Sequence, residues 1–204
     1  GRSGMVIQVD VSDERQVEDM FDKALQEFGT IDILMNNAAI NAAGIRLEDM
    51  STERWRQVMS VNVDGYFFCT RRFIRLRKQK GGGGKIINVT SVHEEIPMPG
   101  ATDYDASKGA IRNLTRTLAL EVAEYGMTVN NIAPGMVLTP MNQEAMDDPE
   151  TRKKQTDNIP LKRAAEPKEI ARLAVFLASE DAAYVTGSSY VMDGGLMQTV
   201  GQGA

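Results

Sequence analysis

The sequence predicts an α/β protein built on a doubly wound parallel sheet with helices on both faces. Short, almost continuously apolar segments alternate along the chain with longer segments whose apolar residues recur at helical spacing. No internal repeat and no low-complexity linker interrupts this alternation. A chain of 204 residues, 42% of them hydrophobic, can bury one sizeable core, so we expect a single domain over 1–204.

Capping and turn residues bound the expected elements. Ser12-Asp13-Glu14 suits a helix start and Gly29 suits the end of that helix, while Asn36-Asn37 suits a turn after a buried strand. A polar stretch within about 140–160 is expected to form a mobile flap. In chain order we expect strand 5–11, a helix from 12–14 to 29, strand 31–35, one long helix from 52 to about 80, strand 85–89, a helix that carries Tyr104 and ends at Gly126, strand 128–132, helix 167–177 and strand 189–192.

Composition excludes several classes of function. The net charge is −5, so the basic cluster at 71–80 is expected to be a solvated helix end rather than a nucleic-acid site. Cys69 is the only cysteine, which rules out an intrachain disulfide and suits a reducing compartment. No apolar run approaches the roughly 18 residues that span a bilayer, and no signal peptide is visible. We expect a cytoplasmic protein with no membrane or nucleic-acid partner and, since no cluster has metal-ligand spacing, no metal.

The chemistry centres on Tyr104 and Lys108, four residues apart at the start of a helical stretch, with Ser91 thirteen residues upstream. Four residues is just over one helical turn, so the phenol and the ammonium share a face. A cation about 4 Å from the phenol would favour the phenolate and lower the tyrosine's pKa. A serine hydroxyl beside the pair could hold a substrate oxygen. These are the parts needed to move a proton on or off an alcohol.

The candidate residues fall where the predicted strands end. In a parallel α/β sheet, ligands bind beyond the carboxyl ends of the strands. Five candidates occupy such positions: Asp10, Asn37, Ser91, Pro134 and Gly135.

With these residues placed, the chain resembles the short-chain dehydrogenase/reductase family over nearly its whole length. The resemblance rests on several motifs in order, of which Tyr-x-x-x-Lys alone would be weak. They are Asp10-Val11, Asn36-Asn37-Ala38-Ala39, Asn62 in Ser60-Val61-Asn62-Val63, Ser91, Tyr104-x-x-x-Lys108 and Asn131-Ile132-Ala133-Pro134-Gly135. Within the family the chain is most similar to glucose 1-dehydrogenases and related sugar or polyol dehydrogenases, through 91–97, 129–135 and the tail from 184 to 195.

The resemblance implies a Rossmann-like fold, an NAD or NADP cofactor and hydride transfer to or from a secondary alcohol or carbonyl. Its implied catalytic residues are Asn62, which kinks its helix and holds a relay water, Ser91, which holds the substrate oxygen, Tyr104 as the acid/base, and Lys108. Its implied cofactor-binding residues are Asp10, Val11, Asn37, Ala38, Tyr104, Lys108, Pro134, Gly135, Val137 and Thr139. It also implies a homotetramer built through the long helices of Asn62 and Tyr104 and the C-terminal strand, and a flap that closes over the substrate.

Simpler interpretations stay open for several of these residues. Asp10 could belong to a helix cap, and Asn62 could be an ordinary polar residue inside a helix. His93, the only histidine, could touch substrate or be an exposed loop residue. Glu94 and Glu95 are expected to be solvated, with a contact to a polyol as the alternative.

The chain also departs from the family. Relatives open with a strand, a Thr-Gly-x-x-x-Gly-x-Gly turn, a helix and a second strand, and here Gly1-Arg2-Ser3-Gly4 leads directly into what matches the third strand. In the 3-2-1-4-5-6 strand order, the two absent strands would lie between the third and the fourth. Without them the strand at 5–11 has no neighbour and the strand at 31–35 has an unpaired apolar edge. We therefore expect the sequence to omit roughly sixty preceding residues. The 2′ position of the cofactor is read at the absent second strand, so NAD and NADP cannot be distinguished. A non-catalytic Rossmann-like binding or regulatory protein is the alternative function, and a lyase or epimerase is a third.

Overall fold

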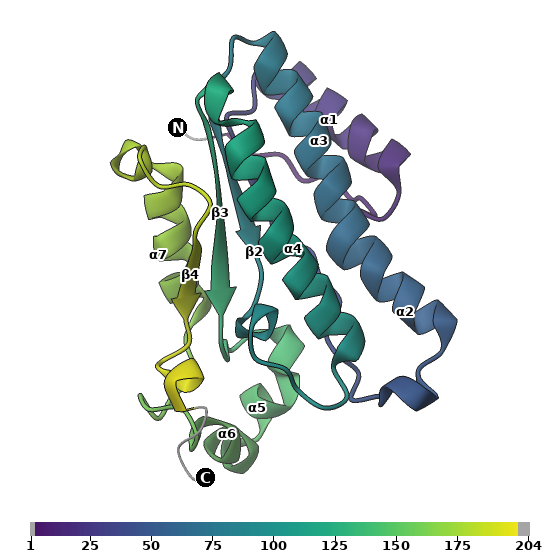
Figure 1. The fold of residues 1–204 in the computed structure, drawn as a ribbon, viewed down its shortest axis with the longest axis vertical. Helices are drawn as coiled ribbons and strands as arrows, with labels where there is room; N and C mark the ends of the chain where they lie inside the picture. Colours follow the sequence, from purple (N-terminus) through teal and green to yellow (C-terminus); the bar gives the residue numbers. More distant parts are fainter. Residues whose placement is uncertain (1–2, 200–204) are drawn as a thin grey trace.

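A computed structural model describes residues 3–199 as a four-stranded parallel sheet flanked by helices (Figure 1). The strand order is β1-β2-β3-β4, and every neighbouring pair is parallel. The strands are β1 (Ile33–Asn36), β2 (Gly84–Val89), β3 (Met127–Pro134) and β4 (Ser189–Met192). They confirm four of the predicted strands.

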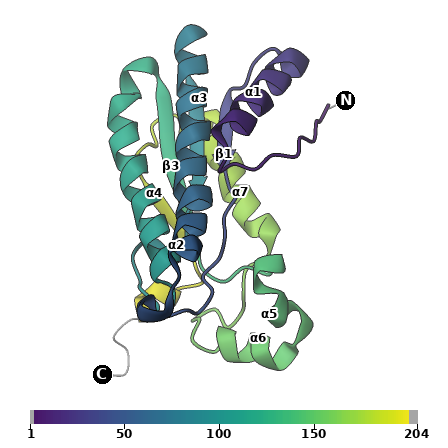
Figure 2. The same ribbon diagram turned by 90° about the vertical axis from the view of Figure 1, so that its right-hand side faces the viewer.

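Helices cover both faces of this sheet, as the predicted fold class requires. α1, α3 and α4 lie over one face, and α7 lies over the other (Figures 1 and 2). The helices are α1 (Glu14–Phe28), α2 (Thr52–Met59), α3 (Gly65–Gln79), α4 (Thr102–Glu121), α5 (Gln143–Asp147), α6 (Pro149–Thr156) and α7 (Pro167–Ala178). Within residues 3–199, none of the helices is long and apolar enough to cross a membrane.

Alternate residues of β2 supply the cores on the two faces. Ile86 joins the cluster under α1, α3 and α4, which includes Phe21 and Phe73. Ile87 points to the opposite face and joins Ile132 under α7. Burying a large aliphatic side chain contributes about 1.5–3 kcal/mol, so this alternation holds helices on both sides of one strand.

The first predicted strand does not form. Residues 5–11 run extended without pairing to any strand in the described part of the chain, and Val6 is 99% exposed. An extended segment becomes a strand only when a neighbour accepts its backbone hydrogen bonds. The outer edge of β1 is unpaired in residues 3–199, and its Ile33 and Met35 are 45% and 42% exposed. Val11 nevertheless packs closely on Gly65, the first residue of α3. A Cβ added to that glycine would lie only 2.8 Å from Val11 Cγ2.

The predicted long helix from 52 to 80 is interrupted. Residues Ser60–Asp64 form a π-helical turn between α2 and α3. Asn62, at its centre, is fully buried, and its side chain bonds outside its own helix. Such single-turn bulges occur where a side chain is re-aimed toward a site. The stretch predicted as a flap folds as α5 and α6, with Asp148 accepting hydrogen bonds from Glu150 N and Thr151 N.

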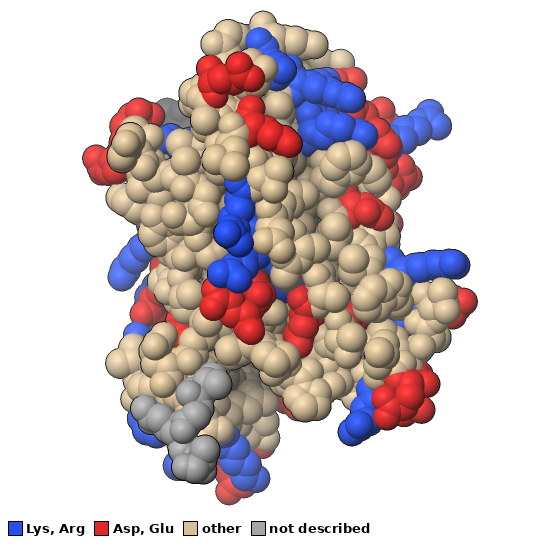
Figure 3. Space-filling model, in the orientation of Figure 1, with Lys and Arg blue, Asp and Glu red and all other residues tan. Residues whose placement is uncertain are grey.

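Half of the six basic residues at 71–80, namely Arg71, Arg72 and Arg77, pair with acidic residues. Arg72 binds Glu18 and Asp22 of α1 at 2.7 Å each, and Arg71 pairs with Glu14. Figure 3 shows basic and acidic side chains interspersed over this view of the molecule. The cluster therefore joins two helices instead of forming an open basic field.

A row of buried amides crosses all four strands at one level. Asn36, Asn88, Asn131 and Ser189 are successive register partners in β1 to β4. Asn36 Nδ2 donates to Asn88 Oδ1 at 2.8 Å, and Asn131 Nδ2 donates to Ser189 Oγ at 3.0 Å. Between them Thr115 of α4 accepts from Asn88 at 2.9 Å and donates to Asn131 at 2.6 Å. We call these five residues the amide ladder.

We expect Asn88→Leu to lower the free energy of unfolding by about 2–4 kcal/mol, because it leaves buried partners in β1 and α4 unsatisfied. Urea denaturation measures this change, with Asn113→Ala, an exposed asparagine of α4, as the control. A loss below about 1 kcal/mol for Asn88→Leu would show that the ladder does not stabilise the sheet.

Candidate active site

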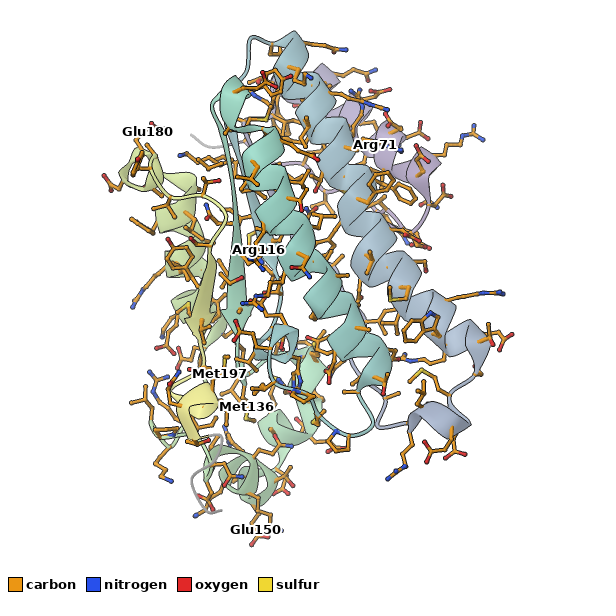
Figure 4. All side chains as sticks on the ribbon, in the orientation of Figure 1. Arg71, Arg116, Met136, Glu150, Glu180 and Met197 are labelled. Carbon is orange, nitrogen blue, oxygen red and sulfur yellow. The ribbon has the colours of Figure 1, made fainter. Side chains whose placement is uncertain are left out.

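The predicted site residues converge at the carboxyl edge of the sheet, the edge to which the strands point. Ser91 follows β2, Asn37 follows β1 and Gly135 follows β3. The first turns of α4, which carry Tyr104 and Lys108, pack against the short 3-10 helix after Ser91. In Figure 4, Met136 just beyond β3 and Glu150 of α6 lie toward this end of the molecule, and Glu180 lies toward the other.

Ser91 and Tyr104 lie together and are both 7% exposed. Ser91 caps the 3-10 helix Val92–Glu94, and its Oγ accepts a hydrogen bond from His93 N at 3.2 Å. Burial raises the pKa of Tyr104, the Ser91 hydroxyl acts in the opposite direction, and the charge of Asp105 raises the pKa further. The phenol is therefore held in its neutral form.

Lys108 lies under the same surface and is 2% exposed. Its Nζ donates to Val89 O at 3.0 Å and lies 5.4 Å from the ring centroid of Tyr104. Burial lowers the pKa of Lys108 to about 8, and the negative charge of Glu94 opposes that shift. Burial is the main influence on the pKa of Tyr104 here, and the Lys108 ammonium bonds to the Val89 carbonyl rather than to the phenol. The lowering of the Tyr104 pKa by Lys108 stays a prediction.

Asn62 ties the loop after β1 to α4. Its side chain accepts from Ile40 N at 2.7 Å and donates to Ile40 O at 2.9 Å, and it also donates to Ser107 Oγ at 3.1 Å. Ser107 in turn donates to Tyr104 O at 2.7 Å. One lone pair of the Asn62 oxygen is left for a water. Asn62 is thus more than a polar residue inside a helix, because it closes a chain of contacts from loop to acid/base helix.

Two contributors to the site were missed in the sequence. Ser107 was passed over between Tyr104 and Lys108, although its place one turn from the tyrosine carbonyl was a usable signal. Tyr66 is buried, donates to Val89 O at 2.8 Å and has its pKa raised by burial. It shares that carbonyl with Lys108. Only the fold could reveal this, because Tyr66 lies on another helix.

The residues expected at the adenine side remain on the surface. Asn37, Ala38 and Asp10 are exposed. Asp10 accepts from Ser12 N and Ser12 Oγ at 2.9 and 2.7 Å, and these bonds lower its pKa. Asp13 is the N-cap of α1, and Asp10 lies in the turn just before it, where its N–H donates to Gln16 Oε1 at 3.0 Å and its carbonyl accepts from Asp13 N at 3.1 Å. These bonds agree with the alternative that Asp10 belongs to the start of the helix cap.

The residues expected at the nicotinamide side follow β3. Gly135 N donates to Met192 O at 3.0 Å, and a Cβ at Gly135 would lie 2.9 Å from Asp193 Cα, so only glycine fits. Val137 pairs with Ala165, and Thr139 begins a short 3-10 turn at Pro140–Asn142. Pro134 ends β3.

Donor chemistry at Lys108 fits the ribose of a nicotinamide cofactor. An ammonium has three donors, and one is used on Val89 O. The other two suit the paired hydroxyls of a ribose. Over residues 3–199 no three His, Cys, Asp or Glu side chains are arranged to hold a metal ion.

Of the residues after Ser91, Glu94 differs from expectation, Glu95 is exposed as expected, and His93 is partly exposed. Glu94 is not solvated: its side chain is 1% exposed, and its Oε1 lies 3.7 Å from Arg112 Nε. Glu95 is 39% exposed and pairs with Arg112 Nη2 at 2.7 Å. His93 is 21% exposed, with its Nδ1 at 3.1 Å from Asp105 Oδ1 and its ring edge-on to Tyr104 at 5.8 Å. The 3-10 helix Val92–Glu94 packs on α4, and the Glu94 side chain is covered there.

Known proteins match both the sequence and the structure. The family model described as Enoyl-(Acyl carrier protein) reductase matches residues 1–197. The chain is 38% identical over 196 residues to glucose 1-dehydrogenase 2 of Bacillus subtilis (strain 168), covering 96% of this chain and 76% of that protein. It is 43% identical over 196 residues to 3beta-hydroxysteroid dehydrogenase 1 of Eggerthella lenta, covering 96% and 75%.

A solved structure agrees with these relatives. A gluconate 5-dehydrogenase from Burkholderia cenocepacia J2315, in complex with NADP and tartrate, superposes with a TM-score of 0.86 at 35% identity, covering 93% of this chain and 74% of that one. The chain thus spans about three quarters of the length of the proteins it matches. On these matches and the site geometry above, the chain belongs to the short-chain dehydrogenase/reductase family.

Proposed function

We propose that this protein is an NAD(P)-dependent oxidoreductase that transfers hydride between the nicotinamide and a secondary alcohol or carbonyl. The observation that carries the proposal is the meeting of Ser91, Tyr104 and Lys108 with the loop clamped by Asn62. The three relatives described above are named as dehydrogenases, which supports the same reaction and does not favour a non-catalytic binding protein.

The side chains divide the proton chemistry among them. In the reductive direction Ser91 holds the carbonyl oxygen and Tyr104 donates the proton, for which its neutral form is suited. In the oxidative direction Tyr104 first loses its own proton to solvent, and the phenolate then accepts the proton of the alcohol. Lys108 binds the ribose hydroxyls with its two spare donors, and a water on Asn62 relays protons toward it. When bound, the nicotinamide supplies the hydride donor or acceptor.

We assign the cofactor to the carboxyl edge of the sheet. Asp10 and Val11 receive the adenine ring, and Asn37 and Ala38 line the adenosine ribose. The nicotinamide side is formed by residues after β3, namely Pro134, Gly135, Val137 and Thr139. α5 and α6 close over the substrate.

A sugar or polyol is the proposed substrate class. Two relatives are named for glucose and gluconate, and the matches to them cover 96% and 93% of this chain. A screen of sugars, polyols and secondary alcohols with NAD and NADP, followed at 340 nm, tests this. Turnover of sugars or polyols supports the class, and turnover confined to apolar alcohols contradicts it.

We expect Tyr104→Phe to lower turnover by about 10²–10⁴-fold while the cofactor dissociation constant stays nearly unchanged, because only the proton donor is removed. Steady-state rates and nicotinamide fluorescence titration measure the two quantities. Tyr184→Phe, at a fully exposed tyrosine, is the control. Residual turnover within tenfold of wild type would argue against the role of Tyr104.

Because burial lowers the pKa of Lys108, we expect the free energy of unfolding to depend on pH. The pKa of Lys108 is about 8 in the folded state, against the ordinary lysine value of 10.5. Between these values the unfolded state binds more protons, so the free energy of unfolding rises with pH. Relative to Lys108→Met, the wild type should gain about 2–3 kcal/mol between pH 7 and pH 10.

Urea denaturation across this pH range measures the gain. Lys154→Met, at an exposed lysine, serves as the control and should track the wild type. Parallel pH curves for wild type and Lys108→Met would mean that Lys108 keeps an ordinary pKa.

We also propose that the protein is cytoplasmic and assembles as a homotetramer through α3 and α4. An apolar groove between these helices, about 310 Å³ in volume, is lined by Phe67, Ile74, Leu114 and Leu118. Charged residues border it, including Arg71 and Glu121, so a second copy could meet it with both kinds of contact. In Figure 4 the labelled Arg71 and Arg116 mark the two helices that form this face.

Light scattering after size exclusion should give about four times the chain mass of 22.4 kDa. Phe67→Glu should reduce that mass, because it places a charge in an apolar interface. Leu47→Glu, at a 60% exposed leucine outside the groove, is the control. A monomeric wild type, or a Phe67→Glu variant with unchanged mass, would contradict the proposed interface.

A further inference from the structure

A second bridge joins the loop after β1 to α4, and the proposed chemistry does not use it. Arg54 of α2 donates from Nε to Asp103 Oδ2 at 2.8 Å, and its Nη2 donates to Asn41 O. The Arg54 side chain is 18% exposed and that of Asp103 is 1% exposed. One guanidinium therefore contacts both the loop and the helix in a largely buried place.

Asp103 connects this bridge to the acid/base residue. It lies in the first turn of α4, and its Oδ1 accepts the backbone N–H of Tyr104 at 2.8 Å. First-turn N–H groups have no partner within the helix, so a carboxylate that accepts one fixes the turn. The Arg54 bond holds that carboxylate in turn. A shift of Arg54 would thus be transmitted to the backbone that presents the phenol.

Asn41 connects the bridge to the cofactor side. It follows Ile40, whose N–H and carbonyl are both held by Asn62. Adjacent loop residues are therefore clamped by different side chains, one from the π-helical turn and one from α2. Of the two side chains that clamp this loop, Asn62 and Arg54, only Asn62 was singled out from the sequence.

Close packing of the two loops gives independent support. A Cβ on Gly100, just before α4, would lie 2.9 Å from Gly44 C, and both glycines have positive φ, +83° and +72°. No other residue fits so close a backbone approach at these angles. The loop after β1 and the loop before α4 thus meet next to the Arg54 bridge.

We propose that Arg54 is a positioning residue for the hydride-transfer reaction, acting through Asp103 and Asn41 to fix Tyr104 relative to the cofactor loop. This proposal rests on the proposed function for its kinetic effect. The forked guanidinium can bind a carboxylate and a carbonyl at once, whereas a lysine has one nitrogen to share between them. A displacement of about 1 Å at the reacting groups can cost about 10²-fold in rate.

The test compares Arg54→Met and Arg54→Lys with Arg56→Met, at an exposed arginine of the same helix. We expect Arg54→Met to lower kcat at least tenfold, with the cofactor dissociation constant changing less than threefold because Asn62 still holds Ile40. Arg54→Lys should recover at least a third of the wild-type kcat by keeping the Asp103 contact. Arg56→Met should match wild type. If Arg54→Met keeps kcat within twofold of wild type, the inference is wrong.

Hydrogen exchange of the full chain provides a readout that does not need turnover. Arg54→Met should speed exchange in both 40–46 and 102–106, and Arg56→Met in neither. If the wild type turns over no substrate, the proposed function fails, and the exchange result alone decides on the bridge. Unchanged exchange in both segments would overturn it.

Discussion

The amide ladder is the interaction on which the rest of the structure depends. A parallel sheet could place its strands in several registers, and apolar side chains alone distinguish poorly between them. Here Asn36, Asn88, Asn131 and Ser189 are successive register partners. Hydrogen bonds join Asn36 to Asn88 and Asn131 to Ser189, and Thr115 links Asn88 to Asn131. A slip in any strand would leave a buried amide unpaired, at about 1–3 kcal/mol for each lost partner. The ladder therefore fixes where all four strands end.

Because the strand ends are fixed, the residues after them share one edge. Ser91 lies three residues beyond Asn88, and Gly135 lies four beyond Asn131. Thr115 belongs to the ladder and also to α4, so the helix that carries Tyr104 and Lys108 is set against the same level of the sheet. Asn62 and Arg54 then bring the loop after β1 to that helix. The site is assembled from the sheet outward.

Burial determines the protonation states of the two titratable groups at the centre of the site. It raises the pKa of Tyr104 and lowers that of Lys108, so both groups are pushed toward their neutral forms. The sequence interpretation considered the attraction between the two and not the burial, which raises the pKa of the tyrosine here. Desolvation depends on how deeply a side chain is buried, and the spacing of residues along a helix does not show how deeply each one is buried.

Periodicity and capping residues were sufficient to predict much of the fold. β4 matches its prediction to the residue, and α1 is bounded by Asp13 and Gly29 as expected. Residues 5–11 have the composition of a strand but no partner, and pairing is a tertiary property. The π-helical turn at Asn62 was suggested only by resemblance, because an asparagine inside a helix does not specify its partner. Arg54 could not have been found, since its contacts with Asn41 and Asp103 join segments far apart in the chain.

The central claim is direct hydride transfer at the edge that the ladder organises. It is tested most directly by incubating the protein with a ketose and NADPH or NADH deuterated at nicotinamide C4, in each stereochemical form. NMR of the product alcohol should then show deuterium on the new carbinol carbon with one form of the cofactor and none with the other. A reduced product without deuterium from either form, or product formed without cofactor oxidation, would contradict the account.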